Sequence, residues 1–397
     1  MNGTYGNLKF LEPDPNWGLW SHCLDYAGAT DLGLRRANNQ DNLAVLLVGT
    51  EKEFQRRGHL FLVADGMGAH AAGELASKIA ADEIPLTYMK HPDKNPAEAL
   101  RSAIQQANEK IHQRGQQSED FQGMGTTVSA LVLLPQGALV AHVGDSRVYR
   151  LRGQVLEQLT FDHSLPWELY RDQPKSEIPA GIPRNVILRS LGPRPTVEVD
   201  LEGYYPLEVG DTFLVCTDGL SGQVSNEEIA TILQCLPCKE ALQVFVDLAN
   251  LRGGPDNITG IIVKLTGQLH LAQQGTPAGG KKNVGPQAAT PSVLASLLRW
   301  LFGSGAEKKR RWGKGPYERL ECPLGPTVPQ TLQTVVQELR NAAANSQWQI
   351  DWDQFNLLET SGQSALQNSQ FQEAVQHFSR AIICMMYQLR QQRPKIA

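Results

Sequence analysis

The stretch Val63-Ala64-Asp65-Gly66 ends an apolar run that begins at Leu60. A strand-like run that closes on Asp-Gly places a carboxylate at the end of a strand, because glycine permits the sharp turn that follows. Two other aspartates have similar surroundings: Asp218 follows the run FLVCT, and Asp256 precedes ITGIIVKL. If these strand ends lie side by side, three carboxylates converge on one pocket.

Carboxylates gathered in this way need compensation, because like charges a few ångströms apart raise each other's pKa. Divalent cations relieve that repulsion, and ligands made only of oxygen favour hard cations such as Mg²⁺ or Mn²⁺ over zinc. Two such ions about 3.5–4 Å apart can activate a bridging water and hold a phosphoryl group for attack. The aspartates therefore predict a two-metal site for Mg²⁺ or Mn²⁺.

Outward from these residues, short apolar runs typical of strands alternate with amphipathic stretches typical of helices. The predicted strands are 43–48, 60–65, 128–134, 138–143, 211–218 and 258–265. The predicted helices are 71–89, 96–117, 226–235, 239–252, 331–343, 353–367 and 371–389. The spacing is too irregular for repeated βαβ units and favours an α+β fold with helices covering sheets. The order of the strands does not follow from this pattern.

Composition limits the function classes. The 397 residues are 41% hydrophobic with a net charge of −4, which argues against a nucleic-acid binder. The charge is uneven: from residue 269 onward 14 Lys and Arg stand against 8 Asp and Glu, while the preceding part is acidic. The chain shows no secretory signal and no apolar run of about 18 residues, so a soluble cytoplasmic protein is expected.

The six cysteines have no framework spacing, which fits a reducing compartment. Cys235 and Cys238 form a single C-x-x-C pair with no second pair or histidines nearby. We interpret them as small residues at a helix junction, with a redox or zinc role as the less favoured alternative.

The C-terminal third has a different character. Residues 268–286 are rich in Gly, Gln, Ala and Pro and indicate a flexible linker. The apolar segment 292–302 and the basic run at 308–311 fit either contact with an anionic membrane surface or a docking helix with a solvated end. The expected organisation is an N-terminal extension (1–23), a catalytic domain (24–267), a linker with the apolar and basic segment (268–330) and a helical region (331–397).

Within the helical region, small residues recur where two paired helices would approach. Gly362 and Ala365 precede Phe371, Phe378 and Ala381 in a pattern that resembles one tetratricopeptide-repeat hairpin. One such unit is not stable alone, so it would pack on the preceding helix or on another protein. A protein partner or peripheral membrane contact through residues 292–397 is therefore expected.

Taken together, ordered motifs over about 240 residues resemble the protein phosphatase 2C family, the metal-dependent serine/threonine phosphatases, in its bacterial form. The motifs are Thr30 to Asp41 (TDLGLRRANNQD), Val63 to His70 with Gly73-Glu74, Gly123 to Thr127 (GMGTT), Val143 to Arg147 (VGDSR), Thr217 to Leu220 (TDGL) and Gly254 to Thr259 (GPDNIT). The resemblance implies a central β-sandwich of two antiparallel sheets flanked by helices, in four layers α-β-β-α, with the small helical region added.

The resemblance also implies the ligands of the metals. Asp65 would bridge both ions and the carbonyl of Gly66 would bind the first, while Asp218 and Asp256 would hold the second. Asp41 is similar to the carboxylate that hydrogen-bonds metal-bound water in the family.

Other motif residues match further roles. Asp145 resembles the carboxylate that helps to hold a weaker third ion in bacterial members, and Arg36 matches the phosphate-binding arginine. A planar guanidinium suits that task because it grips two phosphate oxygens at once. His70, two residues beyond Gly68, is a candidate proton donor to the leaving oxygen because imidazole titrates near neutrality. Ala69 stands where the bacterial pattern has glycine.

The implied reaction is direct attack of a metal-activated water on phosphoserine or phosphothreonine, with His70 or a metal-bound water protonating the leaving group. The substrates would be phosphorylated proteins, such as those of a serine/threonine kinase. Residues 161–192 resemble the family's flap beside the cleft. Two alternatives remain: a pseudophosphatase that binds phosphoproteins without hydrolysis, and a scaffold that acts through its C-terminal helices.

Overall fold

Two antiparallel sheets packed face to face form the centre of the protein. The structure, a computed structural model, describes residues 7–68, 71–91, 93–170, 182–183, 186–270, 315–346 and 348–392. The first sheet runs in the order β1 (Lys9–Phe10), β2 (Leu24–Asp31), β12 (Ile258–Leu265), β11 (Thr212–Cys216), β8 (Arg147–Arg152), β9 (Val155–Gln158) and β13 (Glu318–Glu321). The second runs β10 (Asp200–Tyr205), β7 (Gly137–Val143), β6 (Val128–Leu134), β4 (His59–Met67) and β3 (Asp41–Leu46), and β5 (Gly125–Thr126) pairs with β4.

Strand β4 shows how the apolar runs divide between two cores. Side chains alternate between the faces of a strand, so consecutive apolar residues supply both faces. Phe61 and Val63 belong to the core between the two sheets, together with Val215 of β11. Leu60 and Leu62 belong to the core beneath the outer helices. A continuous apolar run is therefore required where a sheet is covered on both sides.

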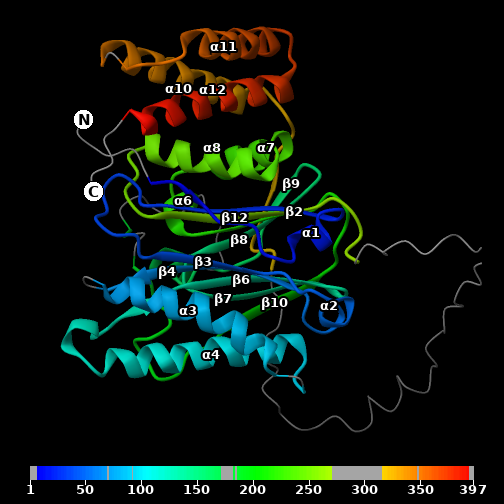
Figure 1. The fold of residues 1–397 in the computed structure, drawn as a ribbon, viewed down its shortest axis with the longest axis vertical. Helices are drawn as coiled ribbons and strands as arrows, with labels where there is room; N and C mark the ends of the chain where they lie inside the picture. Colours follow the sequence, from blue (N-terminus) through cyan, green and yellow to red (C-terminus); the bar gives the residue numbers. More distant parts are fainter. Residues whose placement is uncertain are drawn as a thin grey trace, which may run out of the picture.

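Helices cover the outer face of each sheet, as Figure 1 shows. On the second sheet lie α3 (Ala72–Met89) and α4 (Pro96–Gly115); on the first lie α7 (Asn226–Cys235) and α8 (Cys238–Leu251). Helix α7 begins with a capping box between Ser225 and Glu228. The shorter helices are α1 (Trp17–Trp20), α2 (Glu51–Arg57), η1 (Glu119–Phe121), α5 (Leu165–Leu169) and α6 (Asp218–Ser221). The predicted sandwich flanked by helices is confirmed.

Three C-terminal helices form a further layer on α7 and α8 (Figure 1). They are α10 (Thr327–Asn345), α11 (Trp352–Gln367) and α12 (Phe371–Gln391). Phe378 and Ile382 of α12 are fully buried in one core with Leu242 and Phe245 of α8. The tail is thus joined to the catalytic domain through a continuous apolar core. Likeness of α11 and α12 to a tetratricopeptide repeat stays a prediction.

The expected domain boundaries need correction at two places. The predicted linker 268–330 extends too far, because β13 pairs with β9 in register from Glu318 to Glu321 and α10 begins at Thr327. The described part of the predicted extension, residues 7–23, also belongs to the fold: β1 pairs with β2, and the buried Trp20 donates to the carbonyl of Val48 at 2.7 Å. The apolar and basic segment at 292–311 lies outside the described residues.

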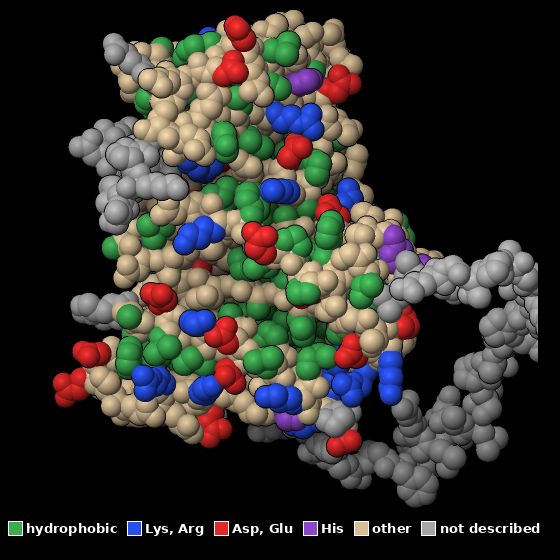
Figure 2. All heavy atoms as spheres, viewed as in Figure 1, with side chains coloured by type: hydrophobic (Ala, Val, Ile, Leu, Met, Phe, Trp, Pro, Cys, Tyr) green, Lys and Arg blue, Asp and Glu red, His purple; other side chains and the backbone are tan. Residues whose placement is uncertain are grey.

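On the face drawn in Figure 2, Lys and Arg are interspersed with Asp and Glu, without a continuous basic stripe. No helix among the described residues is both long and apolar enough to cross a membrane. Cys235 and Cys238 are buried at the α7–α8 junction, where burial raises the pKa of the Cys235 thiol to about 12. Redox or zinc chemistry needs thiolates, which this burial disfavours.

Candidate metal centre

Two of the predicted aspartates face each other across neighbouring strands. Strand β3 begins at Asp41, and its antiparallel neighbour β4 ends just beyond Asp65, so the register pairs the two residues directly. Directly opposed residues on one face of an antiparallel pair have Cβ atoms about 4.5–5.5 Å apart. Equal charges at that distance are unfavourable, which indicates a site that a cation completes.

The other three aspartates reach the same end of the sandwich from different segments. Asp145 lies in the connection between β7 and β8, which passes from one sheet to the other. Asp218 begins α6 directly after β11, and Asp256 stands just before β12. Because β11 and β12 are antiparallel, with Cys216 opposite Gly260, the end of one and the start of the other share an edge.

Burial and mutual repulsion shift the ionisation of these groups. Burial, with added effects from the charges of Asp218 and Asp256, raises the pKa of Asp41 to about 7. Burial and the charge of Asp218 raise the pKa of Asp145 to about 8. Burial and the charge of Asp41 hold the pKa of Asp65 well above its ordinary value. The pKa of Asp218 is raised by burial and by Asp256. The five carboxylates therefore interact as one electrostatic cluster.

The donor set fits hard divalent cations. A buried carboxylate oxygen of Asp41, of Asp145 and of Asp218 has no hydrogen-bond partner among the described residues. Such orphaned anionic oxygens are costly unless a ligand satisfies them. Among the described residues, no group of three acidic, His or Cys side chains is arranged so that it could hold a metal ion. Mg²⁺ tolerates this because it keeps several waters and takes one or two carboxylates.

Neighbouring hydroxyl and amide groups hold the cluster in place. Thr217 donates to the second oxygen of Asp41 at 2.9 Å, and the amide N–H of Asp65 donates to the hydroxyl of Thr127 at 3.0 Å. Asn257 accepts from the amide of Gln40 at 2.8 Å and donates to two carbonyls of the loop that carries Arg36. These bonds tie the predicted ligands to a rigid backbone.

The remaining predicted residues lie around the cluster. Arg36 is half exposed, and its Nη2 atom lies 2.7 Å from a carboxylate oxygen of Asp256. Gly66 follows Asp65 in β4, and its N–H donates to the carbonyl of Gln40 at 3.1 Å. His70, the predicted proton donor, and Ala69 lie outside the described residues, so the structure places neither of them.

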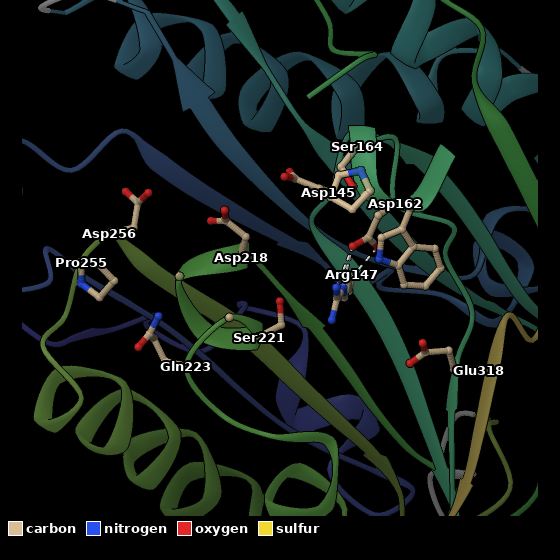
Figure 3. A pocket seen from close by; sticks show the side chains of 14 residues that line it. Asp145, Arg147, Asp162, Ser164, Asp218, Ser221, Gln223, Pro255, Asp256 and Glu318 are labelled. Carbon is tan, nitrogen blue, oxygen red and sulfur yellow. Dashed lines mark hydrogen bonds and ion pairs between the residues drawn. The ribbon is translucent and has the colours of Figure 1, made fainter. Parts of the chain in front are cut away.

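A cleft of about 480 Å³ opens beside the aspartates. Figure 3 shows the carboxylates of Asp256, Asp218 and Asp145 following one another along it, with Glu318 of β13 at its other end. Arg147 stands between them, and two of its nitrogens donate to Asp162 at 2.7–3.1 Å. The cleft is thus strongly acidic, with one paired arginine.

The comparisons with known proteins decide the family. A family model described as protein phosphatase 2C matches residues 35–249. The chain belongs to the protein phosphatase 2C family. A serine/threonine phosphatase of Listeria monocytogenes is 38% identical over 256 residues, which cover 63% of this chain and 97% of that protein.

Solved structures of this family agree with the fold. The serine/threonine phosphatase PstP/Ppp of Mycobacterium tuberculosis matches with 33% identity and a TM-score of 0.53, over 61% of this chain and 99% of that one. A catalytic domain of PstP in complex with two manganese ions matches with 31% identity and a TM-score of 0.51, over 62% and 99% of the two chains. The family is metal-dependent, and the C-terminal helices lie beyond its matched range.

Four residues at or near the site of this phosphatase 2C protein have no role predicted from the motifs. Thr217 belongs to the motif of Asp218, but its hydrogen bond to Asp41 joins residues 176 positions apart and has no local sequence pattern. Asp162 and Trp167 lie in the predicted flap, where no local pattern distinguishes residues that face the cleft. No sequence pattern indicates that Glu318 lies at the cleft, because its position depends on the pairing of β13 with β9.

Proposed function

We propose that this protein is a metal-dependent protein serine/threonine phosphatase that hydrolyses phosphoserine and phosphothreonine in phosphorylated proteins. The observation that carries the proposal is the convergence of five carboxylates, three with orphaned buried oxygens, at one end of a phosphatase 2C sandwich. Serine/threonine phosphatases among its relatives and the two manganese ions of a structural neighbour support it.

The aspartates and Gly66 have different proposed roles at the metal site. Asp65 and the carbonyl of Gly66 would hold one ion, and Asp218 and Asp256 would hold another. Asp41 would accept a hydrogen bond from water at the site, and Asp145 would serve a weaker third position. When bound, Mg²⁺ or Mn²⁺ supplies an activated water and neutralises the charge that develops on the phosphoryl group.

Arg36 orients the substrate in this proposal. Its ion pair with Asp256 places the guanidinium beside the carboxylate cluster while leaving the side chain half exposed. From this position the Arg36 guanidinium can leave the Asp256 carboxylate and bind two phosphate oxygens without a large movement. His70 or a water molecule then donates the proton to the departing seryl or threonyl oxygen.

The decisive experiment is hydrolysis of a phosphothreonine peptide with increasing Mn²⁺ or Mg²⁺. We expect turnover that is lost on chelation and restored by either ion, with kcat in the ordinary enzyme range of about 1–10³ s⁻¹. The matched phosphotyrosine peptide is the control. Binding of the phosphothreonine peptide without turnover at any metal concentration would instead support the pseudophosphatase alternative.

The acidic cleft also bears on substrate choice. Beyond the proposed metal ligands, Asp162 is paired with Arg147, and Glu318 adds a further carboxylate at the far end. Glu318 accepts from Asn226 at 3.3 Å and is half buried. Complementary charge selects partners by favouring the right sign and repelling the wrong one. We therefore expect phosphopeptides with a basic residue near the phosphorylated position to be preferred.

Glu318→Gln tests this preference. The variant should raise KM for a phosphopeptide with flanking arginines by about threefold, which matches the small free energy of a partly exposed charge pair. KM for a neutral phosphopeptide and kcat for both should stay unchanged. Glu321→Gln is the control because Glu321 is exposed on the same strand and outside the cleft. Equal effects on both peptides would exclude a charge-selective role.

A further inference from the structure

A buried ion pair joins the last helix to the catalytic domain. Asp247 of α8 is completely buried, and Arg390 of α12 contacts its carboxylate with a side chain that is only 14% exposed. Burial raises the pKa of Asp247 to about 7, an effect that the charge of Arg390 opposes. Arg390 therefore compensates a charge that the domain core would otherwise hold without a cation.

A second buried carboxylate lies close to this pair. Asp31, at the end of β2, is also completely buried, and its Oδ1 atom accepts from the side chain of Asn250 at 3.1 Å. Burial raises the pKa of Asp31, while the charge of Arg390 lowers it. The charge of Asp31 in turn acts on Asp247. Asp247 and Asn250 are three residues apart on α8 and therefore lie on the same side of the helix, so the ion pair with Arg390 and the hydrogen bond to Asp31 are neighbours.

Asp31 holds the start of the loop that carries Arg36. Its Oδ1 atom also accepts from the N–H of Gly33 at 2.8 Å. Gly33 has a φ of +75°, and a Cβ there would lie 2.1 Å from the carbonyl oxygen of Asp256. The loop is therefore held at Gly33 by the hydrogen bond to Asp31 and by close contact with the backbone of Asp256. Arg36, three residues further on, then pairs with the Asp256 carboxylate.

We infer that Arg390 is a positioning residue of the phosphatase site, which acts through buried Asp247 and Asp31 on the loop of Arg36 and on Asp256. The inference rests on the proposed roles of Arg36 in phosphate binding and of Asp256 in metal binding. Arg390 lies beyond residue 249, where the family match ends, so the inference assigns this positioning role to the C-terminal helices.

The ordinary alternative is that Arg390 only fastens α12 to α8. A matched pair in the same interface separates the two roles: Arg380 of α12 contacts Glu240 of α8 at 2.9 Å, but both side chains are substantially exposed. Arg380→Met should remove an interhelical ion pair without leaving a buried charge. Arg390→Met removes the ion pair and leaves Asp247 and Asp31 without their cation.

The test measures three quantities on the full chain: KM for a phosphothreonine peptide, the Mn²⁺ concentration for half-maximal activity, and Mn²⁺ affinity by titration calorimetry. Arg390→Met should raise KM and the half-maximal Mn²⁺ concentration about tenfold, in the range of coupling between distant sites. Arg390→Lys keeps the charge and should stay within about twofold of the wild type, as should Arg380→Met.

Unchanged constants in Arg390→Met, or equal losses in Arg390→Met and Arg390→Lys, would overturn the inference. If Arg390→Met does not fold, the double variant Arg390→Met/Asp247→Asn takes its place, since it leaves only Asp31 charged. It should still show weaker Mn²⁺ binding than Arg390→Lys, and wild-type affinity would overturn the inference. Calorimetry needs no turnover: a wild type that binds Mn²⁺ without hydrolysis would contradict the proposed function alone.

Discussion

Asp218→Asn is expected to lower kcat by about a thousandfold or more, because a neutral amide cannot replace an anionic ligand of a catalytic cation. Asp218 follows β11 directly, and one of its buried oxygens lacks a partner among the described residues. Steady-state turnover of a phosphothreonine peptide at saturating Mn²⁺ measures the loss. The substitution keeps the shape of the side chain, so the fold should be retained.

Stability distinguishes a lost ligand from a damaged fold. Removing one charge from the cluster relieves the repulsion that Asp218 shares with Asp256, so the Tm of the metal-free variant should equal or exceed that of the wild type. Asp82→Asn is the control, since Asp82 pairs only at the surface with Lys78. Substantial activity in Asp218→Asn, or a parallel loss in Asp82→Asn, would contradict the assignment.

Metal removal is expected to make stability depend steeply on pH. In the metal-free fold the pKa is about 7 for Asp41 and about 8 for Asp145, against an ordinary value of 3.8. A raised carboxyl pKa means that these groups favour folding fully below about pH 4 and lose that contribution as the pH rises through 7 and 8. The Tm of the chelated protein should therefore fall by roughly 5 °C or more between about pH 5 and pH 8.5.

Bound cations should reverse this trend, because they favour the ionised carboxylates. Mg²⁺ or Mn²⁺ should raise the Tm more at high pH than at low pH, as scanning calorimetry can measure. Asp145→Asn should flatten the decline in the chelated protein. A Tm independent of pH in both the wild type and this variant would show that the carboxylates do not form a repulsive cluster.

The C-terminal helices bear on the scaffold alternative. Deletion from residue 269 would remove β13 from the edge of the first sheet and expose the apolar face of α7 and α8 that α12 covers. Loss of activity in such a deletion would therefore report loss of core packing as well as loss of any partner. Point variants at Arg390 and Glu318 separate these effects. Docking of a partner or a membrane through residues 292–397 remains a proposal.

The sequence by itself determined the chemistry and most of the elements. Runs such as Leu60–Asp65 and Ile258–Leu265 are predictable as strands because apolar residues occupy both of their faces. The sharp turn expected at Asp65-Gly66 is not formed there, because β4 continues to Met67. The aspartates could be assigned in order because each motif is local. Their convergence was an expectation until the strand pairing brought Asp41 opposite Asp65.

Only the tertiary structure decided how the tail joins the site. Strand β13 is polar, and an edge strand is held by main-chain hydrogen bonds that any side chain allows, so Glu318–Glu321 carried no strand pattern. Arg390 and Asp247 are 143 residues apart and meet only because α12 packs on α8. A buried ion pair is set by the shape of two packed helices, which no local pattern encodes.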